Sequence, residues 1–336
     1  MNIFMIGEAS NHAPTLQADL TEDARIVPLP REAGFEPTYD DAIGEDDIVI
    51  SLRFRRQGHA PRFRMLHVPG AGLDGIDFDS IAPKTVVCNV FEHEIPIAEY
   101  VLSAMLEWEI RASVMRRDFR ADNWPEMYRN RVPHGEICGK TLGLIGFGRI
   151  GRAIAERARA FGMRIVALDR ATAADDGTAD QILRPDDLPA LLSQADYTVI
   201  ACPLSPETQG MIGQAQLAAM DPDAVLINVS RAEIVEEAAL YDALAGRRIG
   251  GAILDVWYRY PVGSDDHVAP CNFPFHDLSN AVCTPHSSAW TGNLPKRRYS
   301  KIAGNIERLR RGEPLTNVVW AARTDRDTQT TPNLQT

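Results

Sequence analysis

The chain has 336 residues, of which 45% are hydrophobic and 24% charged, a composition typical of a globular protein long enough for two domains. Its formal net charge of -11 leaves no excess of Lys and Arg for phosphate contacts, which argues against nucleic acid and anionic membranes as partners. The five cysteines are odd in number and form no C-x-x-C, so neither a disulfide framework nor a zinc site is expected.

No stretch approaches the ~18 consecutive apolar residues of a membrane helix. The opening run M-N-I-F-M-I-G is too short for a signal peptide and lacks the positive flank. Together with the cysteine usage, these features predict a soluble protein of the reducing cytoplasm.

The N-terminal part of the chain carries short apolar runs, which are nearly continuous, as in strands buried on both faces of a parallel sheet. Strands are expected at 2–7, 24–28, 47–52, 64–68 and 85–90. A long helical pattern follows at 96–118, where Pro96 suits a first helical turn.

A second series of apolar runs predicts further strands, with helical patterns between most of them. These strands are expected at 141–146, 164–168, 197–201, 224–228, 250–256 and 280–284. Such alternation predicts an α/β protein with two doubly wound parallel sheets. A final amphipathic helix is expected at about 293–311, and the polar segment 323–336 is expected to be disordered.

The run G-F-G-R-I-G at 146–151 matches G-x-G-x-x-G and lies between a predicted strand and a predicted helix. Gly146 would allow the tight turn, Gly148 would let the backbone approach a pyrophosphate, and Gly151 would let the helix pack on the strand. The helix begins near Arg149 and Ile150, where free N–H groups would face the phosphates. A glycine-rich turn without any ligand is the alternative.

The next strand ends at Asp169, where an acidic residue is expected to bind the adenine-ribose hydroxyls. A carboxylate there would repel a 2′-phosphate, which favours NAD over NADP. Arg170 weakens that preference, because an arginine in this place could bind a phosphate.

Three further segments resemble the D-isomer-specific 2-hydroxyacid dehydrogenase family: I-N-V-S-R-A-E-I-V-E-E-A-A-L at 227–240, G-A-I-L-D-V-W at 251–257 and T-P-H-S-S-A-W-T at 284–291. The likeness runs from about residue 45 to about residue 312. It implies a Rossmann NAD domain at 97–290, inserted in a flavodoxin-like substrate domain made of 1–96 and 291–322. It also implies a homodimer with a dimer arm at about 105–138.

The same resemblance implies roles for individual residues. His286, which follows an apolar run that we expect to be a buried strand, would exchange the substrate hydroxyl proton, and Arg231 would bind the carboxylate and the carbonyl oxygen of the substrate. Backbone N–H groups around Ala71 and Gly72 would form a nest for the carboxylate. The alternatives are a structural histidine in the core and an arginine in a surface ion pair.

Further contacts follow from the likeness. The cofactor would contact Cys202, Pro203, Leu204, Thr208, Val229, Ser230, Asp255 and Ser288. Asn89 matches an asparagine that contacts substrate in the formate dehydrogenases, and Arg53 would bind a second anionic group or be a solvated arginine. Weaker candidates are His93, Tyr258 and Trp290, whereas Trp108 and Trp257 are expected to be packing residues.

The sequence departs from the family pattern at Tyr260, where the family normally has a glutamate that raises the pKa of the catalytic imidazole. A phenol can orient an imidazole by one hydrogen bond, but it brings no negative charge near neutral pH, since its reference pKa is ~10. We therefore expect a lower pKa for His286 than in relatives with the glutamate, which favours oxidation of a hydroxy acid. Asp265 or Asp266, in the longer loop that follows, could supply the missing charge instead.

Two other functions remain as alternatives. Formate dehydrogenases of this family also carry a neutral residue, glutamine, at the position of Tyr260, so a small anion such as formate is a possible substrate. The C-terminal-binding-protein corepressors share the fold and use NAD to control assembly, which would make this chain a regulatory protein. Turnover of hydroxy acids or formate would distinguish these readings.

Overall fold

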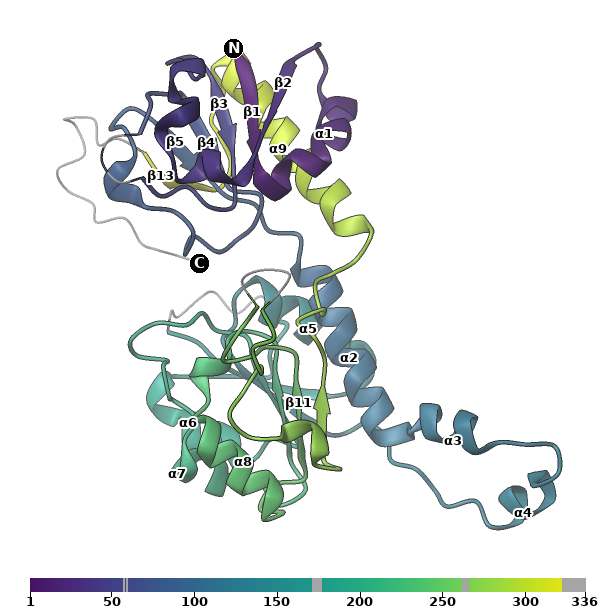
Figure 1. Ribbon diagram of the computed structural model, residues 1–336. Helices are drawn as coiled ribbons and strands as arrows, with labels where there is room; N and C mark the ends of the chain where they lie inside the picture. Colours follow the sequence, from purple (N-terminus) through teal and green to yellow (C-terminus); the bar gives the residue numbers. More distant parts are fainter. Residues whose placement is uncertain (57, 59, 171–176, 262–265, 322–336) are drawn as a thin grey trace. The chain divides into compact units, whose positions relative to one another are not determined.

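The computed structural model describes residues 1–56, 58, 60–170, 177–261 and 266–321, shown as coloured ribbon in Figure 1. The segment 323–336 and Asp265 lie outside these residues. The chain forms two compact units: Met1–Glu92 with Thr291–Thr336 make unit 1, and His93–Trp290 make unit 2. The first boundary falls at 92/93, ahead of the expected 96/97, because the helix that begins at Glu94 packs within unit 2.

Unit 1 is built on a six-stranded sheet of order β13-β5-β4-β3-β1-β2. Its strands are β1 (Asn2–Ile6), β2 (Arg25–Leu29), β3 (Ile48–Ile50), β4 (Met65–His67), β5 (Val86–Cys88) and β13 (Val318–Trp320). The first five are parallel, in the 2-1-3-4-5 order of flavodoxin-like folds. β13 pairs antiparallel with β5 at the edge and is a strand that the sequence analysis did not predict.

Helices α1 (Ala13–Asp19) and α9 (Asn293–Arg311) pack on one face of this sheet. Tyr299, Ile302 and Ile306 of α9 join a buried cluster with strand residues such as Ile3 and Ile50. The other face is covered by loops and the short 3-10 helices η2 (Arg31–Gly34), η3 (Pro37–Ala42) and η4 (Phe78–Ser80), whereas η1 (Gly7–His12) packs with α9 through Ala9. α9 occupies the range expected from its amphipathic pattern.

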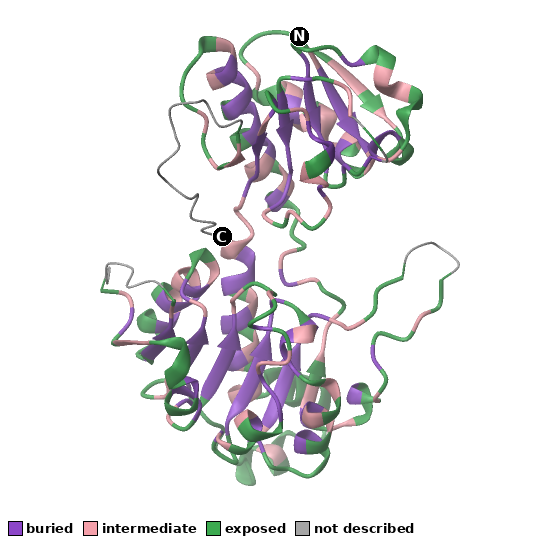
Figure 2. Cartoon of the chain, turned by 90° about the vertical axis from the view of Figure 1, so that its left-hand side faces the viewer, coloured by how far each residue is buried: buried purple, intermediate pink, exposed green. Residues whose placement is uncertain are grey.

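Unit 2 contains a parallel seven-stranded sheet of order β12-β11-β10-β9-β6-β7-β8, whose strands are largely buried in Figure 2. The strands are β6 (Thr141–Ile145), β7 (Arg164–Leu168), β8 (Gln181–Leu183), β9 (Tyr197–Ile200), β10 (Val225–Asn228), β11 (Gly251–Leu254) and β12 (Ala281–Cys283). This is the Rossmann order, whose switch point lies between β6 and β9. All the expected strands are present, and β8 is a short addition.

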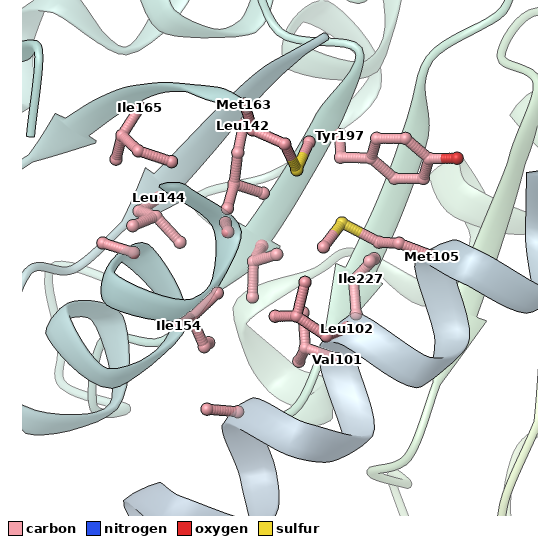
Figure 3. Close-up of a cluster of buried hydrophobic side chains, with 14 of the residues drawn as sticks. Val101, Leu102, Met105, Leu142, Leu144, Ile154, Met163, Ile165, Tyr197 and Ile227 are labelled. Carbon is pink, nitrogen blue, oxygen red and sulfur yellow. The ribbon is translucent and has the colours of Figure 1, made fainter. Parts of the chain in front are cut away.

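Helices cover both faces of the second sheet. The helices of unit 2 are α2 (Glu94–Ile110), α3 (Ala112–Asp118), α4 (Trp124–Arg129), α5 (Arg149–Ala160), α6 (Leu188–Leu192), α7 (Gln214–Ala218) and α8 (Glu237–Ala245), with the 3-10 helices η5 (Pro185–Asp187), η6 (Ala232–Ile234) and η7 (Phe275–Asp277); of these described helices, α3 and α4 do not contact the sheet. α2 and α5 pack on one face around the apolar side chains shown in Figure 3. α6, α7 and α8 pack on the other face.

The single helix expected at 96–118 is wrong, because α2 ends at Ile110. Arg111 takes a left-handed conformation, with φ +54°, and α3 starts after it. The buried positions of α2 end at Met105, so the chain beyond has no core to follow. α3 and α4 instead form an extension that leaves the body of unit 2 in Figure 1, and we call residues 111–136 the arm.

Across the described ranges, no helix combines the length and apolar character needed to cross a bilayer. The His, Cys, Asp and Glu side chains of the same ranges form no cluster that could hold a metal ion. The five cysteines are all free.

Candidate functional site

The glycine turn lies at the switch point of the second sheet, between the carboxyl ends of β6 and β9. Gly146 follows β6 with a φ of +103°, which side chains rarely tolerate. A Cβ atom there would lie 2.6 Å from the backbone nitrogen of Cys202, which follows β9. The backbone of the loop after β6 therefore lies directly against that of the loop after β9, with no side chain between them. This is the place where doubly wound folds bind ligands.

The start of α5 completes a cradle for phosphate. Gly148 is the residue before the helix, and no side chain caps the first turn. A Cβ on Gly151 would come within 2.3 Å of the carbonyl oxygen of Gly146, so the helix approaches the turn as closely as glycine allows. The first-turn amides, which include those of Arg149 and Ile150, have no intrahelical acceptor and favour an anion. These residues fit the pyrophosphate of a dinucleotide.

The end of β7 carries the expected acidic residue. The backbone N–H of Asp169 donates to the carbonyl of Leu183 (3.1 Å), which ties this position to β8. Arg170 next to it is exposed and pairs with Glu207, at 3.5 Å between Nη2 and Oε2. The arginine therefore already has a carboxylate partner, although a pair so exposed is weak.

The loop after β9 holds the next group of expected cofactor residues. The hydroxyl of Thr208 donates to the carbonyl of Pro203 (2.8 Å) and accepts from the N–H of Ser205 (2.7 Å), which closes the loop into a turn. Leu204 is exposed at its tip. Burial raises the pKa of the Cys202 thiol to about 11, so this cysteine is a packing group and not a nucleophile.

Arg231 lies on a turn that follows β10 and is organised by Asn228. The amide oxygen of Asn228 accepts from the N–H of Ser230 (3.1 Å), and its nitrogen donates to the carbonyl of Arg231 (2.9 Å). Ser230 in turn donates its hydroxyl to the carbonyl of Cys202, and Val229 is buried. Arg231 itself is exposed, and its Nη1 donates to the Ser230 carbonyl (2.9 Å).

Asp255 is fully buried at the end of β11 and organises the turn that carries His286. One carboxylate oxygen accepts from the Thr284 hydroxyl (2.6 Å) and the N–H of Ser287 (2.8 Å), and the other accepts from the N–H of Ser288 (2.9 Å). The expected role of Asp255 beside the cofactor is thus accompanied by a second one, since its charge holds three donors of the turn.

His286 differs from the expectation of a histidine after a buried strand. β12 is the edge of the sheet, its residue Val282 is 43% exposed, and the histidine itself is exposed. Its backbone is left-handed, with φ +56°, a conformation that residues other than glycine seldom adopt. Desolvation lowers the pKa of His286 below its usual value, the charge of Asp255 raises it, and the charge of Arg231 lowers it.

Tyr260 contacts His286, but not by the hydrogen bond considered from sequence. The rings are tilted by 50° with centroids 5.3 Å apart, while the phenol oxygen accepts from the N–H of Trp257 (2.9 Å). Burial raises the pKa of Tyr260, so the phenol is neutral at physiological pH. No carboxylate among the described residues bonds to the imidazole, and Asp266 accepts from Val268 (3.1 Å).

The substrate residues expected in unit 1 lie on the three loops that follow β3, β4 and β5. Asn89 is buried and donates its amide to the carbonyl of Ala71 (3.0 Å), so it shapes the loop that continues to the exposed Gly72. Its amide oxygen is buried without a partner in the described structure. Arg53 is exposed, and the hydroxyl of Ser51 donates to its carbonyl (2.7 Å), which fixes the backbone and leaves the guanidinium outward.

Sequence reasoning missed several residues that build the site. Asn228 carried a signal, because it is a polar residue at the end of an apolar run. Trp257 packs against the core as expected, and its indole nitrogen also donates to the carbonyl of Thr284 (2.9 Å). Tyr100, whose hydroxyl lies 2.7 Å from that of Thr284, was not expected at the site, since it belongs to a helix far away in sequence. Trp108 does pack against the core.

Residues 102–288 match the family model described as the NAD binding domain of D-isomer specific 2-hydroxyacid dehydrogenase. The chain belongs to the D-isomer specific 2-hydroxyacid dehydrogenase family. The match covers more than half of the chain and includes the glycine turn, Arg231, Asp255 and His286.

Named relatives agree with this assignment. The chain is 32% identical over 262 residues to a D-3-phosphoglycerate dehydrogenase of Methanocaldococcus jannaschii, a match that covers 77% of this chain and 48% of that protein. It is 30% identical over 301 residues to a glyoxylate reductase of Thermococcus gammatolerans, covering 85% and 84%. The chain thus spans about half the length of the first relative and most of the second.

The fold is that of solved family members. A D-isomer specific 2-hydroxyacid dehydrogenase from Lactobacillus delbrueckii ssp. bulgaricus, crystallised with NAD, superposes with a TM-score of 0.75. The superposition covers 95% of this chain and all of the other, at 24% identity. Both doubly wound units predicted from the sequence are therefore those of the family, and NAD is a cofactor of that family.

Proposed function

We propose that this chain is an NAD-dependent dehydrogenase that transfers a hydride between a D-2-hydroxy acid and NAD. One observation carries the proposal: Arg231 follows β10 and His286 follows β12, so both lie at the carboxyl-end edge of the sheet that also carries the glycine turn, where the charge of Arg231 lowers the pKa of His286. An acid/base and a permanent anion-binding cation are what an oxidoreductase of small hydroxy acids needs.

Different residues bind the cofactor, bind the substrate and transfer the proton in the proposed reaction. When bound, NAD supplies the nicotinamide that accepts or gives the hydride. The turn from Gly146 to Gly151 holds its pyrophosphate, and Asp169 binds the adenine ribose. Arg231 binds the substrate carboxylate and carbonyl oxygen through its planar fork, and His286 takes the hydroxyl proton in oxidation and returns it in reduction.

By the family resemblance, the remaining expected contacts are assigned in the same way. The cofactor contacts would be Arg170, Cys202, Pro203, Leu204, Thr208, Val229, Ser230, Asp255 and Ser288. The substrate contacts in unit 1 would be Arg53, Ala71, Gly72 and Asn89. The pairing of Arg170 with Glu207 supports NAD over NADP, because the arginine is already engaged by a carboxylate.

Measuring NAD reduction against a panel of acids tests the function. D-glycerate, D-lactate and malate-like acids should give turnover with NAD, and the L-isomers should not. Turnover of formate alone would replace the proposal with the formate alternative. If NAD bound tightly and changed the oligomeric state while none of the acids reacted, the corepressor-like alternative would hold.

We also propose that the protein is a homodimer held by the arm. The arm exposes apolar side chains that find no core in unit 2: Val114, Met115, Phe119, Trp124, Tyr128 and Val132. At its root, α2 and α5 form a groove of about 450 Å³ lined by Leu102, Leu106, Ile110 and Phe161, among others. Exposed patches of this kind mark interfaces, and a second copy supplies both surfaces at once in an isologous dimer.

Sedimentation or light scattering tests the dimer. Trp124→Asp on the arm and Leu106→Asp in the groove should each shift the protein toward monomer. Val318→Asp is the matched control, because Val318 is exposed apolar surface at the edge of the other sheet. A wild-type monomer, or an unchanged dimer in both arm and groove variants, would contradict the proposal.

We place the protein in a reducing compartment, since all five cysteines are free.

A further inference from the structure

A chain of hydrogen bonds runs from helix α2 to the turn that carries His286. The hydroxyl of Tyr100 lies 2.7 Å from the hydroxyl of Thr284, and Thr284 lies 2.6 Å from a carboxylate oxygen of Asp255. Asp255 also accepts hydrogen bonds from the backbone N–H groups of Ser287 and Ser288. All of these residues belong to unit 2.

The chemistry of these groups determines which one donates in each hydrogen bond. An ionised carboxylate only accepts, so the single proton of the Thr284 hydroxyl points to Asp255. Tyr100 must then donate its own proton to Thr284. Burial raises the pKa of Tyr100, which keeps the phenol a neutral donor over the working range of pH. The result is an ordered relay, Tyr100 to Thr284 to Asp255, in which each bond polarises the next.

Thr284 joins the turn to its neighbours by hydrogen bonds of its backbone as well as of its hydroxyl. Its N–H donates to the Leu254 carbonyl (2.9 Å), and its carbonyl accepts both the Trp257 indole (2.9 Å) and the N–H of His286 (3.0 Å). The left-handed backbone of His286 is unfavourable for a residue other than glycine and persists only where the surroundings hold it. The hydrogen bond of the Thr284 hydroxyl to Asp255 is thus one of the contacts that keep the imidazole in place.

We propose that Tyr100 is a positioning residue for His286, acting through Thr284 and Asp255 and not through contact with the substrate. The inference rests on the proposed function, in which His286 is the acid/base. The relay holds a buried carboxylate on the turn beside the imidazole, where Tyr260 has left the histidine without a carboxylate partner among the described residues. Tyr100 thereby takes over part of the support that a glutamate at 260 would give directly.

The charged groups around His286 determine what loss of the relay does. Asp255 is the carboxylate that raises the pKa of His286, and Arg231 opposes it. Tyr260 packs its neutral ring on the imidazole, and Glu233 and Asp255 act on the Tyr260 phenol. If the relay is cut, Asp255 keeps its bonds from Ser287 and Ser288 but is held less firmly at the turn, whereas the desolvation and Arg231 remain. The pKa of His286 should therefore fall further.

Tyr100→Phe and Thr284→Val cut the relay at its two hydroxyls with little change of shape. Tyr197→Phe is the matched control: its buried phenol also donates toward a carboxylate, that of Glu109 (2.5 Å), but lies at the start of β9, the opposite end of the strands. Titration of the His286 ring by NMR, assigned with His286→Gln, gives the pKa without any turnover. Steady-state kinetics of hydroxy-acid oxidation gives kcat and the KM for NAD.

Tyr100→Phe should lower the pKa of His286 and reduce kcat by roughly tenfold, the size expected for a slightly misplaced acid/base group, with an unchanged KM for NAD. Tyr100→Phe and Thr284→Val together should cost no more than Thr284→Val alone, because both act on one chain. Tyr197→Phe should leave the titration unchanged. An unchanged titration in Tyr100→Phe, or the same change in Tyr197→Phe, would overturn the inference. The NMR result decides this even if the wild type oxidises no hydroxy acid, so the two proposals fail separately.

Discussion

The ring of Tyr260 packs against the imidazole of His286, with centroids 5.3 Å apart, while its hydroxyl is taken by the N–H of Trp257. The imidazole is therefore shielded on one side by an apolar surface and receives no charge from it. Desolvation lowers the pKa of His286, and Asp255 opposes this from its place beneath the turn. A neutral histidine is a base, so under the proposed function we expect the lowered pKa of His286 to favour oxidation of a hydroxy acid near neutral pH.

Replacing Tyr260 by glutamate should reverse this balance. A carboxylate beside the ring favours the imidazolium, which raises the pKa of His286. Reduction of a keto acid needs the protonated form, so in the wild type it should decline as pH rises above the ordinary histidine range, and Tyr260→Glu should extend it to higher pH. Tyr260→Gln is the uncharged control. Full wild-type reduction up to pH 8, or equal profiles for the two variants, would count against this account.

Loss of the acid/base group should be visible in kcat. General acid/base catalysis contributes ~10²–10⁴ in rate, so His286→Ala should lower kcat by about that factor. The glycine turn is remote from the change, and NAD affinity measured by fluorescence titration should stay the same. A variant that keeps most of its kcat would show that another group moves the proton.

Arg231→Lys should mainly damage substrate binding. The guanidinium presents a planar fork to a carboxylate, and an ammonium cannot reproduce it. The KM for the hydroxy acid should rise strongly, while binding of NAD stays as in the wild type. The turn itself should survive, because Asn228 holds it through the backbone. A KM unaffected by the change would exclude Arg231 as the carboxylate ligand.

The preference for NAD should depend on Asp169 and on the partner of Arg170. Removing the carboxylate in Asp169→Ser takes away a repulsion for the 2′-phosphate, and Glu207→Gln frees the exposed arginine from its pair. The double variant should raise kcat/KM for NADP about tenfold, since a charge pair at about 4 Å in water is worth ~1 kcal/mol. If kcat/KM for NADP did not rise, the selectivity would lie elsewhere.

His67 should make unit 1 sensitive to acid. Burial lowers the pKa of His67 from 6.5 to about 4, and its ring contacts the amide of Asn305 on α9 (3.1 Å). The unfolded chain takes up the proton first, so the free energy of unfolding should fall as pH drops from about 6.5 toward 4. The loss from this group should be about 2 kcal/mol at pH 5.

Urea unfolding at pH 7 and pH 5 measures this effect. The difference between the two pH values should be smaller in His67→Gln, which has no titrating ring, than in the wild type. His276→Gln, which removes an exposed histidine with 71% of its side chain accessible, should behave as the wild type. Equal pH dependence in His67→Gln and the wild type would show that the buried ring does not report on folding.

The sequence by itself determined the features that depend on neighbours along the chain. Apolar runs predicted the described strands of both sheets except β8 and β13, since a strand buried on both faces must be apolar throughout. The helix α9 followed from its periodicity, and the turn at Gly146 from the need for a residue that tolerates positive φ. The segments around Arg231 and His286 predicted the family by their resemblance to it.

Only the tertiary structure decided what joins residues distant in the chain. The break of the long helix at Arg111 follows from the end of its buried face, and the edge strand β13 from an antiparallel partner in β5. The direction of the Tyr260 hydroxyl and the relay from Tyr100 to Asp255 depend on which strand ends and helices meet. Local patterns carry no information on such meetings, because a hydrogen bond between residues 184 positions apart, as from Tyr100 to Thr284, is made by packing and not by periodicity.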